Sequence, residues 1–395
     1  MSAVEQGGRR AFLRSACRHC AAFGALGLGT GALAQAPAEW KSPPRFLRPS
    51  LDTDEGGLWS MMDREETRMR RSPLVVRDPA LTAYLRDIVC RLGGEQHCAD
   101  VRVYVVRTAQ FNATMAPNGA MQVWSGLLLR VDNEAQLAAV LGHELGHYLE
   151  RHTVERLRDL KNKAAAMTAL AMFGLAGAVA SLGVAASAMG FSRDQELRAD
   201  QIGMRLLREA GYDGRQAAQI WDDLLAELKI RGGDDVGQRS ALFASHPPAG
   251  DRRNALLKIA GDGGGKLGAE ELDRVMAPHR LDWLQEELRR GQFEESLELF
   301  NRKLKLRPED PQFLYGRGEV LRQRGKDEDL APALADLQKG AALEKAPAEL
   351  FRSLGLLHRR REDGAAANAA FEKYLALAPD AGDAALIQTY LTEVK

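Results

Sequence analysis

His143-Glu144-Leu145-Gly146-His147 is the stretch that decides the fold of this 395-residue chain. In an α-helix, residues four positions apart lie above one another on one face, so both imidazoles can bind the same metal ion. Glu144 lies one step around the helix, where it can accept a proton from a water molecule that zinc makes acidic. The pattern predicts a zinc peptidase site with His143 and His147 as ligands and Glu144 as general base.

The flanking residues predict the helix that carries this stretch. Asn133 is suited to cap its N-terminus, with Gln136 at the third helical position and Glu134 in the first turn. Apolar side chains then recur at helical spacing, at Leu137, Val140, Leu141, Leu145, Tyr148 and Leu149. We expect one helix from about Glu134 to Leu160.

Glu196 is the candidate for the third zinc ligand. It lies in the helical stretch Gln195-Glu196-Leu197-Arg198-Ala199-Asp200, which presents Asp200 on the same face four residues later. Asp200 could accept the free ring N–H of a ligand histidine and so fix its tautomer. Taken alone, a Glu and an Asp four residues apart are typical of a solvated helix face. Downstream of a zinc-binding helix, the ligand interpretation is favoured.

Further motifs accompany these residues: Asp78-Pro79-Ala80-Leu81, Asn112-Ala113, Pro117-Asn118-Gly119, Ser125-Gly126-Leu127-Leu128, Ala210-Gly211-Tyr212-Asp213, Ser245-His246-Pro247-Pro248 and Arg252. With them, residues from roughly 75 to 260 resemble the gluzincin-type zinc metallopeptidases that include the CAAX prenyl endopeptidase and the HtpX-type heat-shock protease. The similarity is closest to the periplasmic beta-barrel assembly-enhancing (BepA-type) branch. Asn118 and Gly214 depart from the common family pattern. The resemblance implies one Zn2+ bound by His143, His147 and Glu196, with Glu144 as catalytic carboxylate and Asp200 as partner of a ligand.

The resemblance also implies roles for His246 and Arg252, which match family positions associated with the reacting carbonyl group. In the BepA-type branch the matching histidine can instead bind the zinc and hold the enzyme inactive. A residue before proline is steered into extended backbone, so the sequence predicts a rigid loop that presents His246. A cationic or hydrogen-bonding group beside the metal would stabilise an oxyanion. Both roles for His246, oxyanion stabiliser and inhibitory fourth ligand, stay open.

Two strands are expected before the zinc-binding helix, at Val101 to Val106 and around Gln122 to Leu128. If the second is an exposed edge strand, it can pair with an extended peptide and hold substrate across the zinc. The alternative is an ordinary sheet strand.

Composition and charge are those of an ordinary globular protein of two or three domains. Hydrophobic residues make up 45% of the chain, and 54 acidic residues balance 54 basic ones. This balance gives no indication of nucleic-acid binding.

The N-terminal 34 residues are predicted to be a targeting segment. Arg9-Arg10-Ala11-Phe12-Leu13-Arg14 is a twin-arginine pattern, and an Ala/Gly-rich stretch leads to the small-residue site Ala32-Leu33-Ala34. We expect cleavage after Ala34, an extended linker over residues 35–53, and export to the periplasm. An uncleaved anchor is the alternative, but the segment is short and poor in large apolar residues for a membrane span.

Cys90 and Cys98 remain after signal removal. In an oxidising compartment such a pair is expected to form a disulfide that closes a short loop. Two free thiols are the alternative.

Residues 164–191 carry no charge and are rich in Ala and Gly. One membrane crossing would separate Glu196 from His143 by roughly 30 Å, and two crossings need roughly 40 apolar residues. We therefore expect an apolar helical hairpin beside the site, packed on the domain or in peripheral contact with a membrane.

A Gly-rich linker at 261–267 divides the expected peptidase domain, 54–260, from an all-α domain at 268–395. The latter resembles tetratricopeptide repeats, with small and aromatic residues recurring at Gly291, Phe293, Phe300 and Pro308, at Gly318, Gly325, Ala335, Ala342 and Pro347, and at Gly355, Ala367, Phe371 and Pro379. Antiparallel helices without repeat character are the alternative. The fold class expected overall is mainly α with a small β-sheet.

The sequence thus predicts a zinc endopeptidase of the bacterial periplasm, peripheral to the outer membrane, that acts on misfolded or misassembled envelope proteins. By resemblance, its repeat domain would bind the outer-membrane assembly machinery. The rival hypothesis is a chaperone or adaptor whose hydrolysis is secondary or switched off by His246. A prenyl-protein peptidase is disfavoured because that branch is a multi-span membrane protein.

Overall fold

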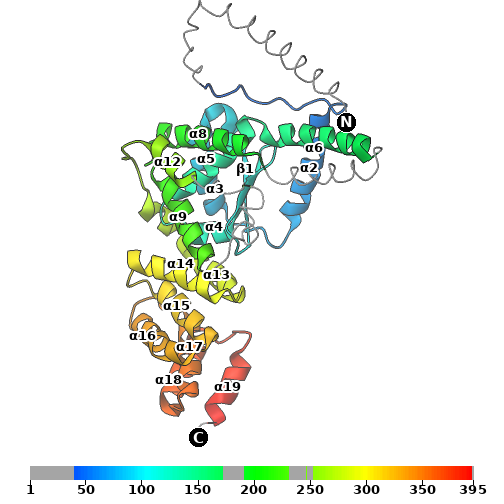
Figure 1. Cartoon of the computed structure of the whole chain (residues 1–395). Coiled ribbons are helices and arrows are strands. Elements are labelled where there is room, and N and C mark those ends of the chain that lie inside the picture. The colour runs from blue at the N-terminus through cyan, green and yellow to red at the C-terminus, as the bar shows by residue number, and fades with distance from the viewer. Residues whose placement is uncertain (1–39, 172–190, 231–245, 247–251, 394–395) are drawn as a thin grey trace, which may run out of the picture. The chain divides into compact units, whose positions relative to one another are not determined.

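The computed structural model describes residues 40–171, 191–230, 246 and 252–393, without side-chain detail for 163–171 and 392–393 (Figure 1). The expected signal peptide, most of the expected apolar hairpin and the two prolines after His246 lie outside the described residues. Among the helices that are described, none is long and apolar enough to span a membrane. The mainly helical fold with a small sheet is as predicted.

The N-terminal part of the described chain holds the sheet and the helices around it. Residues 40–50 form neither helix nor strand. The elements that follow are α2 (Asp54–Arg71), α3 (Pro79–Cys98), β1 (Arg102–Val106), β2 (Ala113–Met115), β3 (Ala120–Trp124), α4 (Ser125–Arg130), α5 (Glu134–Leu149), α6 (His152–Ala171), α8 (Arg193–Glu209), α9 (Gln216–Lys229) and α12 (Arg252–Ala260).

The sheet has the strand order β1-β3-β2, with β3 parallel to β1 and antiparallel to β2. Two strand predictions need correction. β3 ends at Trp124, and the residues predicted to continue it form α4 instead. β3 is also the central strand, so the edge strands are β1 and β2, and β2 packs against α5. With only three residues, β2 is too short to show an alternating sequence pattern.

Helix α5 begins as predicted, since the side chain of Asn133 accepts a hydrogen bond from the backbone N–H of Gln136 at 2.9 Å. The single helix expected to reach Leu160 is wrong. Arg151 has a left-handed backbone conformation with φ of 58°, which ends α5 at Leu149 and lets α6 begin at His152. No Gly or Pro marks this break in the sequence.

Helices α5 and α8 lie side by side at very close range. A Cβ atom placed on Gly146 would come within 2.8 Å of the carbonyl oxygen of Ala199, and one on Gly203 within 2.9 Å of the backbone of Gly142. Glycine is therefore required on both helices for this approach. The close packing brings the ligand candidates on the two helices within reach of one ion.

Helix α3 is interrupted near its C-terminal end by a kink, and a disulfide bridges the two sides of it. Gly94 adopts a left-handed conformation with φ of 71°, and the chain turns so that Cys98 comes back to Cys90. Cys90 and Cys98 form the expected disulfide.

The C-terminal part of the described chain is all helical, namely α13 (Ala269–Arg289), α14 (Phe293–Leu306), α15 (Pro311–Arg324), the 3-10 turn η1 (Asp327–Asp329), α16 (Leu330–Ala341), α17 (Ala348–Arg360), α18 (Gly364–Leu377) and α19 (Ala384–Glu393). Successive helices pack in pairs, α15 with α16 and α17 with α18. Small residues allow this, because a Cβ on Gly318 would collide with Leu337 and one on Gly355 with Phe371. These pairs fit a helical-repeat arrangement.

A group of charged residues, most of them buried, joins α13 and α14 to the part of the chain that carries the sheet. We call it the junction cluster; its members are Arg130, Asp132, Glu227, Glu287, Arg302 and Lys303. Arg130 donates to Glu227 at 2.7 Å and to Glu287 at 3.0 Å. Lys303 donates to Asp132 at 2.6 Å and to the backbone carbonyls of Arg130 and Val131.

Candidate metal centre

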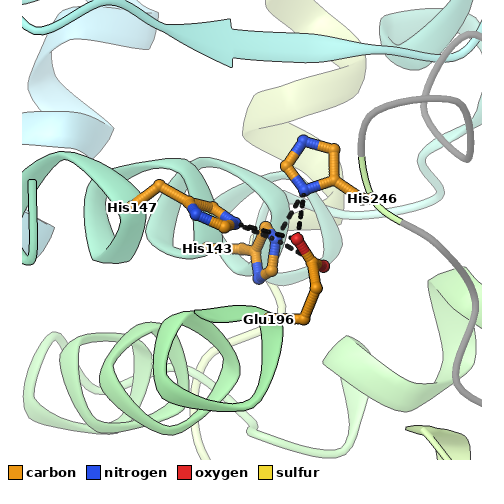
Figure 2. A group of neighbouring side chains, drawn as sticks. All are labelled: His143, His147, Glu196 and His246. Carbon is orange, nitrogen blue, oxygen red and sulfur yellow. Dashed lines mark hydrogen bonds and ion pairs between the residues drawn. The ribbon is translucent and has the colours of Figure 1, made fainter. Parts of the chain in front are cut away.

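His143 and His147 on α5, Glu196 on α8 and His246 form one buried cluster (Figure 2). The Nε2 atoms of His143 and His147 are 3.1 Å apart, and Glu196 Oε1 lies 3.3 Å from His147 Nε2. His246 Nδ1 is 2.9 Å from Glu196 Oε1 and 3.3 Å from His143 Nε2. One potential ligand atom from each residue falls within 4.8 Å of the others. The three predicted ligands are thus brought together, with His246 as a fourth.

Asp200 lies behind His143, on the same face of α8 as Glu196. Its Oδ1 atom is 2.9 Å from His143 Nδ1, the ring nitrogen that does not face the cluster. This is the contact that the sequence predicted for a carboxylate partner of a ligand, because an acceptor on Nδ1 leaves the Nε2 lone pair free for a metal.

Arg252, the first residue of α12, contacts the carboxylates of Glu196 and Asp200 and the ring of His143. It donates to Asp200 at 2.7 Å and to Glu196 at 3.1 Å, and its guanidinium stacks 3.9 Å from the ring centroid of Trp221 on α9. The structure therefore places Arg252 in the site, where it binds Glu196 and Asp200 and is held by Trp221.

Glu144 points into the same cluster but has fewer partners. Its Oε1 atom is buried, accepts no hydrogen bond from the described residues and lies 3.5 Å from His246 Nε2. Burial raises the pKa of this carboxyl. A buried carboxylate oxygen without a donor is unfavourable unless another group completes it, so Glu144 is available for a water molecule or a substrate.

The charges of the cluster fit a divalent cation. Glu144, Glu196 and Asp200 are three carboxylates, and within the described part of the chain the guanidinium of Arg252 is the one set against them. With neutral imidazoles this leaves two negative charges in a buried space, and nitrogen and oxygen donors of this kind suit zinc. Burial lowers the pKa of His143, but the hydrogen bonds to Asp200 and Glu196 outweigh it and raise that pKa to about 9. A proton on His143 would neutralise part of the negative charge that a metal cation would otherwise neutralise.

Two residues that the sequence did not single out also contact the cluster. His152 Nδ1 is 2.9 Å from His147 Nδ1, and the ring of Phe191 stacks on His147 at 4.0 Å. His152 is fully buried, and burial lowers its pKa to about 4. A third histidine five residues after His147 was the available signal, but in one continuous helix it would lie on another face.

Two histidines one turn apart on a helix, a glutamate from the neighbouring helix and a buried glutamate beside them define the class as a metallopeptidase domain of the gluzincin type. Residues 77–260 match the profile of peptidase family M48, and this part of the chain is a domain of that family.

Three similar proteins carry the names of proteases, in agreement with this class. The chain is 34% identical over 158 residues to the "Mitochondrial metalloendopeptidase OMA1" of Arabidopsis thaliana. The aligned residues cover 40% of this chain and 31% of the relative. It is 24% identical over 347 residues to the "Beta-barrel assembly-enhancing protease" of Yersinia pestis, covering 82% and 62%. It is 30% identical over 174 residues to "Metalloprotease YcaL" of Escherichia coli, covering 42% and 65%. The chain thus spans less than two thirds of each of these relatives.

Proposed function

We propose that this chain is a zinc-dependent endopeptidase with His143, His147 and Glu196 as the metal ligands. The observation that carries the proposal is the convergence of these three donors around a buried site with two uncompensated negative charges. Zinc bound there would make a water molecule acidic and polarise the scissile carbonyl group.

Glu144 is the general base in this proposal. Its Oε1 atom faces the ligand cluster without a hydrogen-bond donor among the described residues, and burial raises its pKa. A raised pKa lets a carboxylate hold the proton it takes from water and deliver it to the leaving amine. The role requires only that Glu144 reach the space next to the ligands.

His246 is an inhibitory fourth ligand at rest rather than an oxyanion stabiliser. Its Nδ1 atom lies among the ligand atoms, while its Nε2 lies 3.5 Å from Glu144 Oε1. It therefore occupies the space between the general base and the ligands, which a catalytic zinc site keeps open for water. Activity then requires His246 to move away.

Strand β2 is the proposed binding strand for substrate, in place of the strand predicted from the sequence. It is an edge strand of the sheet, and it packs beside α5, which carries His143 and His147. An extended peptide that pairs with β2 would be held through its main chain, with little preference for sequence.

We propose the bacterial periplasm as the location and misfolded or misassembled envelope proteins as substrates. Three observations support this: the twin-arginine pattern at residues 9–14, the disulfide between Cys90 and Cys98, and similarity over 82% of the chain to a protein named for beta-barrel assembly enhancement. The paired helices α13–α19 would act as tetratricopeptide repeats that bind a partner of the outer-membrane assembly machinery.

A chaperone or adaptor with latent protease activity is the second candidate, favoured by the position of His246 among the ligands. The Glu144→Gln variant separates the two. In the peptidase proposal it lowers the rate of casein cleavage by about 10²- to 10⁴-fold and also impairs envelope assembly in cells. Glu150→Gln, at the end of the same helix, is the matched control and keeps both. Unchanged casein cleavage by Glu144→Gln would contradict the peptidase proposal, and lost cleavage with intact envelope assembly would favour the adaptor.

A further inference from the structure

His152 makes a contact with a ligand histidine that nothing in the peptidase motif requires. The Nδ1 atoms of His152 and His147 lie 2.9 Å apart, and both residues are buried, with exposed fractions of 0% and 2%. His147 Nε2 faces the other ligands, so its contact with His152 is made through the nitrogen on the opposite side of the ring.

The break between α5 and α6 makes this contact possible. In a continuous helix a residue five positions on is rotated by about 140°, which would turn His152 away from His147. The left-handed conformation of Arg151 interrupts the helix and returns His152, the first residue of α6, to the ring of His147. A non-glycine residue in this conformation is uncommon, so it needs a compensating interaction.

Two imidazole nitrogens at 2.9 Å share one hydrogen, and the geometry determines which ring carries it. A metal on His147 Nε2 uses the lone pair of that atom, so the ring proton of neutral His147 must be on Nδ1. His152 Nδ1 is then the acceptor, and His152 carries its own proton on Nε2. His152 thus accepts a hydrogen bond from Nδ1–H of His147, as Asp200 accepts one from Nδ1–H of His143. The distance between Asp200 Oδ1 and His143 Nδ1 is 2.9 Å.

We propose that His152 is a positioning residue for the metal site: it accepts the Nδ1–H of His147 and holds Nε2 of that ring toward the metal. The proposal rests on the function proposed above, in which His147 is a zinc ligand. It also gives the two ligand histidines unequal partners, a carboxylate for His143 and a neutral imidazole for His147, and so limits the negative charge of the site.

Zinc affinity of the purified full chain, measured by competition with a chromogenic chelator, tests this. His152→Phe keeps an aromatic ring but removes the acceptor, so we expect its zinc affinity to fall by about 10- to 100-fold. His152→Asn places an amide oxygen near the position of Nδ1 and should recover most of the loss. Circular dichroism and the melting temperature of the metal-free proteins show that the fold is kept. Wild-type affinity in folded His152→Phe, or no recovery in folded His152→Asn, would overturn the proposal.

A second measurement needs no variant. In nitrogen-15 NMR spectra of the zinc-loaded wild-type chain, we expect a proton on His147 Nδ1 and none on His152 Nδ1, whereas a proton on His152 Nδ1 would overturn the proposal. Failure of this inference is distinct from failure of the proposed function. A wild-type chain that binds no zinc would contradict the peptidase, while a chain that binds zinc equally well without His152 would contradict only the positioning role.

Discussion

The junction cluster and the metal centre are both buried groups of charged side chains, but they balance their charges differently. In the junction cluster the cations Arg130, Arg302 and Lys303 meet three carboxylates, and each member has an oppositely charged partner within 3.0 Å. In the metal centre, Arg252 pairs with Glu196 and Asp200, while the third carboxylate, Glu144, lies 3.5 Å from His246. The first cluster is complete by itself, and the second is complete only with a cation.

The difference separates a structural role from a chemical one. Buried ion pairs that satisfy each other fix the arrangement of the elements that carry them, here α4 with α13 and with α9. A buried cluster that lacks two positive charges is unstable unless protons or a metal ion enter, and a site that recruits a metal can activate water. We therefore expect substitutions in the junction cluster to lower the stability of the fold, and substitutions in the metal centre to weaken zinc binding.

The largest expected effect is the loss of a ligand carboxylate. Glu196→Gln should weaken zinc binding on the order of 10³-fold, because it removes one ligand from a set that supplies roughly 10 to 16 kcal/mol in comparable four-ligand sites. Chelator competition measures this. Glu209→Gln, at the exposed end of the same helix, should bind zinc like the wild type. Equal affinities for the two variants would remove Glu196 from the ligand set.

Next in size is a substitution in the junction cluster. Arg130→Met leaves Glu227 and Glu287 buried with one cation fewer, which should lower the free energy of unfolding by about 3 to 5 kcal/mol. Urea unfolding measures the change, and the folded variant should still bind zinc like the wild type. Arg205→Met on the surface of α8 should change stability by no more than about 0.5 kcal/mol. A stable Arg130→Met variant that binds zinc poorly would contradict the structural role.

A smaller effect, on acid stability, is expected from Glu134 at the start of α5. Burial raises the pKa of its carboxyl, but hydrogen bonds from Lys266, Tyr84 and Tyr212 outweigh it and lower that pKa from 4.5 to about 2. A lowered pKa stabilises the folded state above pH 4.5, and the contribution is lost as the pH falls toward 2.

Glu134→Gln should therefore flatten the loss of stability between pH 4.5 and 2 and cost about 1 to 3 kcal/mol at neutral pH. Thermal unfolding at a series of pH values measures both. If the variant kept the acid slope of the wild type, another group would be responsible for it.

The smallest effect concerns His246. As an inhibitory ligand it should slow the enzyme, so His246→Ala should raise the rate of casein cleavage by about tenfold, equivalent to about 1.4 kcal/mol. The rate at saturating zinc measures this. A rate below that of the wild type would return His246 to the role of oxyanion stabiliser.

The sequence indicated which side chains lie together in the candidate metal centre better than it indicated the local path of the chain. His143, His147 and Glu196 come together because helical spacing and glycines at 146 and 203 allow few other arrangements. The break at Arg151 could not be predicted, because a left-handed arginine is a tertiary result without a residue signal. His152 was missed for the same reason.

The sheet shows a second limit. The first strand was predicted to within a residue, but the edge strand beside α5 has only three residues and no visible alternation. Its place at the edge depends on pairing with β3 across a turn, which periodicity does not encode. The C-terminal helices were predictable in kind, because small residues recur where paired helices approach one another.

The zinc content of the purified full chain, measured together with casein cleavage on the same sample, tests the central claim most directly. The account predicts a single zinc ion per chain, cleavage that disappears when zinc is removed and returns when it is restored, and cleavage slowed by about 10²- to 10⁴-fold in zinc-loaded Glu144→Gln. A chain that takes up no zinc when it is supplied, or that cleaves casein equally well without zinc or without Glu144, would contradict the account.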